Sequence, residues 1–348
     1  HAIQFSYNCF EQLWIMEASA VWSEDQLYNG INDLYRYLNS WFSNSDLPLN
    51  YESSHMYGSF IFFQYLDEHF GGTETIRKVW DYSKENASSS TDISFQAIDF
   101  ALKSEQLNFR EAYHKMTVSN RILDELVQTP YSYIEANGYK TVTSGPNSKE
   151  NIIFKEKDFK QINNQTLKRF STCYYSLSID SPVKVDLSKN SGDFSMSVII
   201  KHNGINRWTI KSDYPINIDP SIDIEWISIV ISALGFNGNN WDFTLNIEDG
   251  FSEDFTLSLP FPNPNYGNDI NFYLEVFNNQ KILITINDVL GRGIWMTTKN
   301  FIHPEATILK WNGLNQIGRK VSNGVYFITA EGISSKKTHK VILLKALK

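Results

Sequence analysis

The sequence is poor in cysteine, in long apolar runs and in net positive charge, and each shortage excludes a class of protein. Its two cysteines, Cys9 and Cys173, lie far apart in a chain of 348 residues, which excludes a disulfide framework and a thiolate metal site. No run approaches the roughly 18 apolar residues of a membrane helix, so we expect no transmembrane segment. The 31 Lys and Arg residues against 39 Asp and Glu residues exclude nucleic-acid binding through a general basic surface.

The length and the charge distribution indicate several domains. At about 150 residues per domain, the chain is long enough for two or three. Residues 259–348 contain eleven Lys and Arg residues against five Asp and Glu residues, whereas the preceding residues contain 20 against 34. This change from an acidic to a basic composition predicts a domain boundary near residue 258.

Up to about Val127, apolar residues recur at the spacing of amphipathic helices. One stripe runs from Ile31 to Phe42, a second from Phe62 to Phe70, and a third from Ile98 to Leu102. This part of the chain is therefore predicted to be helical.

From about Thr129 the pattern changes to short β-branched and aromatic runs separated by Asn, Gly, Asp and Pro. Such runs, for example Ile224 to Ile231 and Trp241 to Ile247, are typical of strands. The Asn- and Gly-rich turn at 237–240 fits a hairpin. The predicted fold is multidomain α + β, with a helical region at 1–128, an accessory β-sandwich at 129–257 and an Ig-like β-sandwich at 258–348.

Glu17 is the residue whose surroundings most need an explanation. In a helix it would lie between the apolar stretches Leu13 to Met16 and Ala18 to Trp22. A buried carboxylate is costly unless a cation, a hydrogen-bond donor or a metal accompanies it. His1 lies 16 residues before Glu17 and is a candidate for a second metal ligand. The alternatives are an exposed His1, and a Glu17 paired with a buried Tyr or Arg side chain.

These residues resemble the gluzincin family of zinc metallopeptidases. In that family, one helix carries H-E-x-x-H with two zinc ligands and a general-base Glu, and the next helix carries a third ligand, a Glu. The stretch from His1 to Phe5 resembles the second His and the turn after it. Trp14 to Ala20 is similar to the W-x-x-E-[AG]-x-A string of the third-ligand helix. The resemblance covers roughly residues 1 to 127 and implies that His1 and Glu17 are zinc ligands.

The same resemblance implies roles for residues further along the helical region. Glu24 or Asp25 would orient a zinc ligand through a hydrogen bond. The stretch from Tyr57 to Gly71 resembles a later helix, so His55 or Tyr57 would stabilise the oxyanion of the tetrahedral intermediate. For these two residues, a place in the core or at a helix end is the alternative.

The chain as given starts at His1, and this position limits what it can do alone. In the gluzincin pattern, the first zinc His and the general-base Glu would lie four and three residues before His1. Because catalytic zinc needs three protein ligands and a water, we expect the chain to be an inactive fragment cut inside the zinc motif. In an intact parent, zinc would activate the water, the Glu would accept its proton, and the hydroxide would attack a peptide carbonyl.

The last ninety residues carry a second set of motifs in order. They are Pro262-Asn263-Pro264, Leu290-Gly291-Arg292, Trp311-Asn312-Gly313, Asn323-Gly324, and the stretch from Lys340 to Lys345. The Pro residues restrict the chain to an extended entry, and the Gly residues favour turns between strands. The segment resembles the C-terminal sorting domain of the type IX secretion system of Bacteroidetes. The resemblance implies that the type IX machinery is a partner, and that the protein passes through the periplasm and the outer membrane to be secreted or displayed on the cell.

Together these features predict a fragment of a secreted zinc metallopeptidase with a peptide or protein substrate and no nucleic-acid partner. The alternative is a non-enzymatic surface adhesin or glycan-binding protein with the same sorting domain. In that case Trp208, Trp226 and Trp241 would form a sugar-stacking face, although burial in a sandwich explains them as well.

Overall fold

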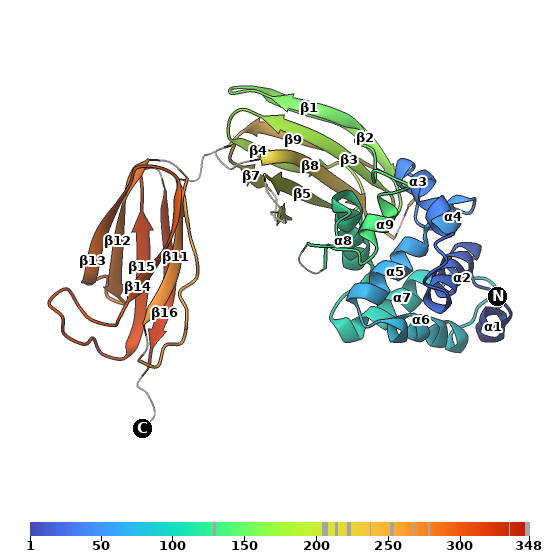
Figure 1. The fold of residues 1–348 in the computed structure, drawn as a ribbon, viewed down its shortest axis with the longest axis horizontal. Coiled ribbons are helices and arrows are strands. Elements are labelled where there is room, and N and C mark those ends of the chain that lie inside the picture. Colours follow the sequence, from blue (N-terminus) through green and yellow to red (C-terminus); the bar gives the residue numbers. More distant parts are fainter. Residues whose placement is uncertain are drawn as a thin grey trace. The chain divides into compact units, whose positions relative to one another are not determined.

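The computed structural model describes residues 1–127, 130–203, 208–212, 215–220, 224–236, 238–250, 254–267, 269–277, 279–333 and 335–344. The chain divides into two compact units, one of His1–Ile218 with Asp223–Gly250, the other of Asp219–Ile222 with Phe251–Lys348. The first unit contains a helical region and a β-sandwich, and the second is a β-sandwich (Figure 1). The predicted combination of a helical part with several β-sheets is confirmed.

The helical region occupies the N-terminal part of the first unit. Its helices are α1 (Ala2–Tyr7), α2 (Leu13–Leu27), α3 (Tyr35–Ser43), α4 (His55–Gly58), α5 (Phe60–His69), α6 (Thr73–Glu85), α7 (Ser94–Leu102), the 3-10 helix η1 (Lys103–Glu105), α8 (Phe109–Ile122) and α9 (Ala136–Tyr139). The glycines that separate α5 from α6, Gly71 and Gly72, have φ angles of 85° and 68°. Glycine adopts such positive φ angles without steric cost, which explains why the helix stops there.

An aromatic core holds the helices together. Trp14 of α2 is fully buried and stacks on Phe95 of α7 at 5.4 Å, and Phe62 of α5 meets Phe109 of α8 edge-on at 5.6 Å. The predicted stripe of α3 faces this core except for Ile31, which is 62% exposed because α3 begins only at Tyr35. The helical spacing therefore identified the buried face but extended it too far towards the N-terminus.

The sandwich of the first unit has a five-stranded and a four-stranded sheet, ordered β1-β3-β8-β5-β6 and β2-β9-β4-β7. Its strands are β1 (Glu150–Phe154), β2 (Phe159–Lys168), β3 (Thr172–Ile179), β4 (Val183–Lys189), β5 (Phe194–His202), β6 (Trp208–Lys211), β7 (Ile216–Ile218), β8 (Ile224–Ala233) and β9 (Asn240–Asp249). The prediction of a hairpin at 237–240 is wrong, because β8 and β9 belong to different sheets. The described residues Gly238 and Asn239 of that segment lie between strands of different sheets, and such a crossing uses the same turn-forming residues as a hairpin.

Helix α8 covers the outer face of the five-stranded sheet, so β8 is buried on both sides. Ile227, Ile229 and Ile231 of β8 face the four-stranded sheet, while Val230 packs with residues of α8. The buried His114 of α8 completes this contact: its Nδ1 lies 2.9 Å from Ser232 Oγ and its Nε2 lies 2.8 Å from Ser197 Oγ. These bonds satisfy both ring nitrogens, so this histidine has a structural role between α8 and the sheet.

The second unit is a sandwich of a three-stranded sheet, β10-β11-β14, and a four-stranded sheet, β13-β12-β15-β16. Its strands are β10 (Phe255–Leu257), β11 (Ile270–Val276), β12 (Gln280–Asp288), β13 (Gly293–Phe301), β14 (Glu305–Trp311), β15 (Gly324–Glu331) and β16 (Lys336–Leu343). Alternate residues of the strands point inward, and Trp311 of β14 is 1% exposed in that core. Its Nε1 donates to the Leu314 carbonyl at 2.8 Å, so its polar atom is satisfied.

Candidate functional site

Helices α1 and α2 bring the two predicted zinc ligands together. His1 caps α1, Glu17 lies one turn into α2, and His1 Nε2 is 3.4 Å from Glu17 Oε2. The Glu17 side chain is 21% exposed and that of His1 43% exposed, so the pair lies at the surface of the helical region. The side-chain contact of Glu17 that the structure describes is thus with the ring of His1.

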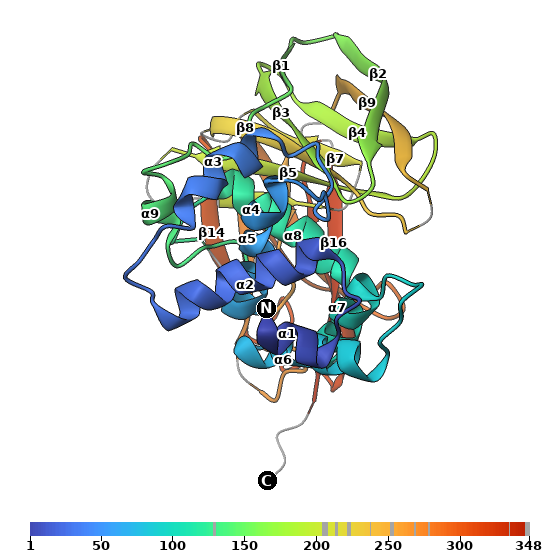
Figure 2. The same ribbon diagram turned by 90° about the vertical axis from the view of Figure 1, so that its right-hand side faces the viewer.

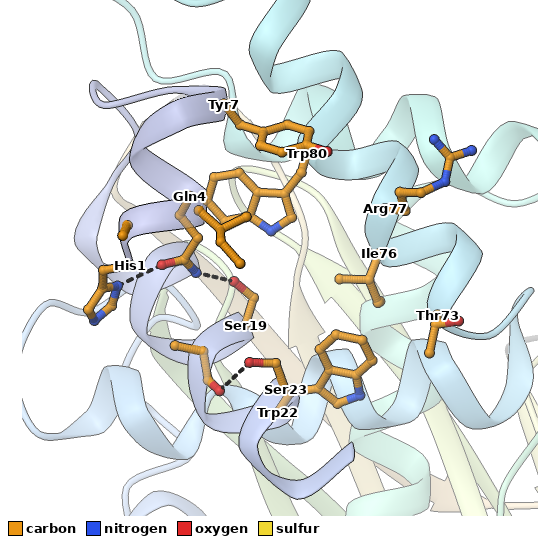
Figure 3. Close-up of a pocket in the computed structure, with 13 residues that line it drawn as sticks. His1, Gln4, Tyr7, Ser19, Trp22, Ser23, Thr73, Ile76, Arg77 and Trp80 are labelled. Carbon is orange, nitrogen blue, oxygen red and sulfur yellow. Dashed lines mark hydrogen bonds between the residues drawn. The ribbon is translucent and has the colours of Figure 1, made fainter. Parts of the chain in front are cut away.

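Gln4 joins the same two helices. Its Oε1 lies 2.6 Å from His1 Nδ1, and its Nε2 donates to Ser19 Oγ at 3.0 Å (Figure 3). The same nitrogen donates to the Met16 carbonyl at 2.8 Å. Gln4 therefore connects the His1 ring to the backbone of the helix that carries Glu17. Sequence reasoning missed this residue, although its position three residues after His1 on one helix face was a usable signal.

A second polar cluster fixes α1 against α6, which lies beside it in Figure 2. Asn8 donates through Nδ2 to the Ser83 carbonyl at 3.2 Å and to Ser83 Oγ at 3.1 Å, and the Ser83 hydroxyl donates to Glu11. Burial raises the pKa of the Glu11 carboxyl. The C-terminal end of α1 is therefore anchored, and this places His1 over α2.

The spacing of the His1–Glu17 pair fits zinc. Zinc lies about 2.0–2.1 Å from an imidazole nitrogen or a carboxylate oxygen, so two ligands of a tetrahedral ion are roughly 3.3 Å apart. The 3.4 Å distance between His1 Nε2 and Glu17 Oε2 agrees with that value. Among the described residues, no group of three or more His, Cys, Asp or Glu side chains is close enough to hold a metal. These residues thus supply two ligands, which is fewer than the three protein ligands of catalytic zinc sites.

A pocket of about 530 Å³ opens beside His1, between α1, α2 and α6 (Figure 3). Its lining is mainly apolar and aromatic, with Trp22, Ile76 and Trp80 on its walls. Ser19 and Gln4 add polar groups near His1. A pocket of this size and composition suits a ligand with an apolar group.

Glu24 and Asp25, the candidates for orienting a zinc ligand, differ in solvent exposure. Glu24 is exposed, whereas Asp25 is 3% exposed. Burial, followed by the charge of Asp33, raises the pKa of Asp25. The charge of Asp25 in turn contributes to the raised pKa of Glu135, which is bonded to Tyr35. Asp25 thus belongs to a carboxyl cluster with Glu135, and its role as an orienting group for a zinc ligand stays a prediction.

His55 and Tyr57, the two candidates for the oxyanion donor, also differ in environment. His55 is 6% exposed, and its ring stacks on Trp41 at 5.5 Å. Gly58 allows this close packing, because a Cβ there would lie 2.6 Å from the Trp41 Cβ. Tyr57 is partly exposed and stacks on Tyr37 at 5.3 Å. Burial lowers the pKa of His55 to about 4, so the ring is neutral near pH 7.

The three tryptophans of the first sandwich do not share one environment. Trp241 is 5% exposed in the sandwich core, whereas Trp208 and Trp226 are half-buried and pack beside α8. Lys201 Nζ lies 4.7 Å above the Trp208 ring, and the Arg121 guanidinium lies 5.1 Å above the Trp226 ring. Each half-buried ring thus has a cation on one face, and the sugar-stacking function stays a prediction.

Two motifs of the second unit that lie far apart in the sequence meet at strand β16. Asn263 donates through Nδ2 to the Lys340 carbonyl at 2.9 Å, and its Oδ1 accepts from the Ile342 amide at 3.0 Å. Pro262 and Pro264 flank Asn263 and leave it without a neighbouring backbone donor, so its side chain completes the pairing. The Pro262–Pro264 segment therefore lies along the edge of β16.

The other motif residues occupy turns or strand ends of the same unit. Gly291 has a φ angle of 78° in the turn between β12 and β13, and Gly324 begins β15. Lys340 is exposed on β16. Lys345 lies outside the described residues.

No protein-family model matches the sequence, and no curated protein matches it. Among solved structures, it is similar to PorZ, a surface component of the type IX secretion system of Porphyromonas gingivalis, at 17% identity and a TM-score of 0.21. It is also similar to dimeric latent PorU from Porphyromonas gingivalis, at 14% identity and a TM-score of 0.26, and to a β-glucuronidase from Ruminococcus gnavus, at 12% and 0.21.

The aligned regions are partial on both sides. They cover 29%, 47% and 46% of this chain, and 14%, 18% and 33% of the PorZ, PorU and β-glucuronidase chains, in that order. With TM-scores below 0.5, these likenesses assign neither a family nor a function to the chain. In the described part of the chain, no helix is long and apolar enough to cross a membrane.

Proposed function

We propose that this chain is part of a secreted zinc metallopeptidase that the type IX secretion system exports. The observation that carries the peptidase proposal is the 3.4 Å distance between His1 Nε2 and Glu17 Oε2. Two side chains from different helices, 16 residues apart, meet there with the spacing of two zinc ligands. The W-x-x-E-A-x-A string around Glu17 supports the same function.

In this proposal, His1 and Glu17 hold zinc together with one further protein ligand. Bound zinc polarises a peptide carbonyl and lowers the pKa of its water towards 7. Tyr57 is the better candidate for the oxyanion donor, because its side chain is partly exposed whereas His55 is buried under Trp41. Replacing Tyr57 by Phe should then lower kcat by about a hundredfold or more while KM changes little.

The first test is the coding sequence before His1. The proposal requires His-Glu-Xaa-Xaa directly before His1, because only that string makes His1 the second ligand of H-E-x-x-H. Any other sequence at those four positions overturns the peptidase proposal.

The second test measures bound zinc in protein that carries those four residues. We expect one zinc per chain in the wild type and a large loss in Glu17→Gln, which keeps the size of the side chain but weakens its ligand oxygen. Glu85→Gln, the same change at an exposed position of α6, is the matched control and should keep its zinc. Equal zinc in the wild type and Glu17→Gln removes Glu17 from the site.

The export proposal depends on the second unit. Its support is the ordered set of motifs, together with the pairing of Asn263 to β16 next to Lys340. A chain without residues 259–348 should accumulate in the periplasm, whereas the full chain reaches the medium or the cell surface. Normal surface appearance of the shortened chain contradicts the proposal.

A further inference from the structure

The orientation of the Gln4 amide follows from its neighbours. The Met16 carbonyl can only accept a hydrogen bond, so the amide nitrogen of Gln4 must lie against it, at 2.8 Å. The same nitrogen reaches Ser19 Oγ at 3.0 Å. Consequently Gln4 Oε1 is the atom that faces His1 Nδ1, at 2.6 Å.

This orientation determines which nitrogen of His1 carries a proton in the neutral ring. A carbonyl oxygen only accepts, so Nδ1 must be the donor in the His1–Gln4 hydrogen bond. The neutral ring then has its lone pair on Nε2, which faces Glu17 Oε2 at 3.4 Å. A lone pair opposite a carboxylate oxygen is an arrangement that a cation between the two atoms stabilises.

We propose that Gln4 is a positioning residue, which fixes the tautomer and the orientation of His1 and so directs Nε2 towards Glu17. This role of Gln4 in zinc binding rests on the proposed function, whereas the tautomer of His1 follows from hydrogen bonds within the chain. Histidines that bind metal usually donate their other ring N–H to an acceptor, and Gln4 Oε1 is that acceptor here. Because Gln4 also bonds to the backbone of α2, one side chain couples the positions of the two ligand helices.

The experiment reads the tautomer directly, by NMR of the whole chain labelled with ¹⁵N in its histidine rings, at a pH where His1 is neutral and without metal. His1→Gln identifies the His1 signals. We expect a protonated Nδ1 and an unprotonated Nε2 in the wild type. Gln4→Met, which keeps the length of the side chain but has no acceptor oxygen, should shift His1 towards the Nε2-protonated form that free imidazole side chains favour.

Two further variants separate positioning from a general effect on α1. Gln4→Glu loses the donor to the Met16 carbonyl but keeps an acceptor for Nδ1, so it should retain the wild-type tautomer if the acceptor alone fixes it. Ser6→Ala, an exposed change on the same helix, should leave the His1 signals unchanged. An Nε2-protonated His1 in the wild type, or a tautomer that is the same in Gln4→Met, overturns the inference. If Gln4→Met releases α1, the Gln4→Glu and wild-type spectra still decide the role of the acceptor.

Zinc binding distinguishes this inference from the proposed function. In the zinc assay described above, Gln4→Met should weaken zinc binding by about 10- to 100-fold. If the wild type binds zinc and Gln4→Met binds it with the same affinity, the role of Gln4 is overturned but the proposed peptidase is not. Absence of zinc from the wild type overturns the proposed peptidase, whatever the tautomer of His1.

Discussion

The helical region and the C-terminal sandwich hold their candidate functional residues in different ways. In the helical region, His1 and Glu17 are 16 residues apart and meet through their side chains. Gln4 connects the His1 ring to the helix that carries Glu17. In the second unit, Asn263 and Lys340 are 77 residues apart and meet through the backbone of an edge strand. The first arrangement depends on a few side chains near the surface, whereas the second is part of the sheet itself. Side-chain changes should therefore disturb the first site without unfolding it, while changes at Asn263 should alter stability.

The largest expected effect concerns the separate cores of the two units. Trp14→Ala removes a fully buried ring of the helical region, and Trp311→Ala removes a 1% exposed ring of the second unit. Each should cost about 3–5 kcal/mol of unfolding free energy, because a cavity remains where the ring was. Hydrogen exchange followed by mass spectrometry should show lost protection only in the unit that carries the change. Loss of protection in β12 and β15 of the Trp14→Ala variant would contradict the division into two cores.

A second prediction concerns the pH dependence of the helical region. Burial lowers the pKa of His55 to about 4 from its ordinary value of 6.5. Between these values the unfolded chain binds more protons than the folded chain, so the stability contributed at this site falls as the pH drops from 6.5 to 4. His55→Phe removes this loss and keeps the stack on Trp41. At pH 5 we expect the variant to be more stable than the wild type by about 2 kcal/mol.

Urea unfolding at pH 7.5 and at pH 5 checks this expectation. The two proteins should have similar stabilities at pH 7.5, because neutral His55 has an Nε2 without a hydrogen-bond partner among the described residues. Tyr57→Phe, a conservative aromatic change in the same helix, is the control and should follow the wild type at both pH values. A difference between the wild type and His55→Phe that is the same at both pH values refutes the prediction.

The sequence predicted which segments form helices and strands better than it predicted which strands share a sheet. Helical spacing identified the buried residues Leu38, Trp41 and Phe42, because a helix face depends only on neighbours along the chain. The turn at 237–240 was misread as a hairpin, since the same residues serve a turn within a sheet and a crossing between sheets.

The candidate site shows the same limit. The pairing of His1 with Glu17 was predictable from a motif, because a Glu within an apolar helix needs a partner and His and Glu are both zinc ligands. The role of Gln4 was not predictable, since it depends on the Met16 carbonyl of another helix, which sets the direction of the amide. The position of Asn263 on β16 likewise required the fold, because no local pattern specifies a partner 77 residues away.

A smaller effect is expected at Asn263. Asn263→Ala removes a donor to the Lys340 carbonyl and an acceptor for the Ile342 amide, which should cost the second unit about 1–2 kcal/mol. Asn263→Asp keeps the acceptor for the Ile342 amide but turns a carboxylate oxygen, which cannot donate, towards the Lys340 carbonyl. Thermal unfolding of the wild type and the two variants should give the wild type the highest midpoint if the side chain completes the pairing. Equal midpoints for Asn263→Ala and the wild type contradict that role.

The smallest effect on stability, and the sharpest separation of structure from recognition, is expected at Lys340. Its side chain is exposed on β16, whereas its backbone carbonyl accepts the bond from Asn263, so Lys340→Ala keeps the pairing and should not move the unfolding midpoint. If the export machinery contacts this lysine, surface display should fall although the unit remains folded. Lys310→Ala, an exposed lysine of β14 outside the motifs, is the matched control for the loss of one positive charge. Equal display of both variants would mean that the motif at β16 acts through its backbone pairing alone, and a fall in both would mean that general positive charge, not the motif, governs export.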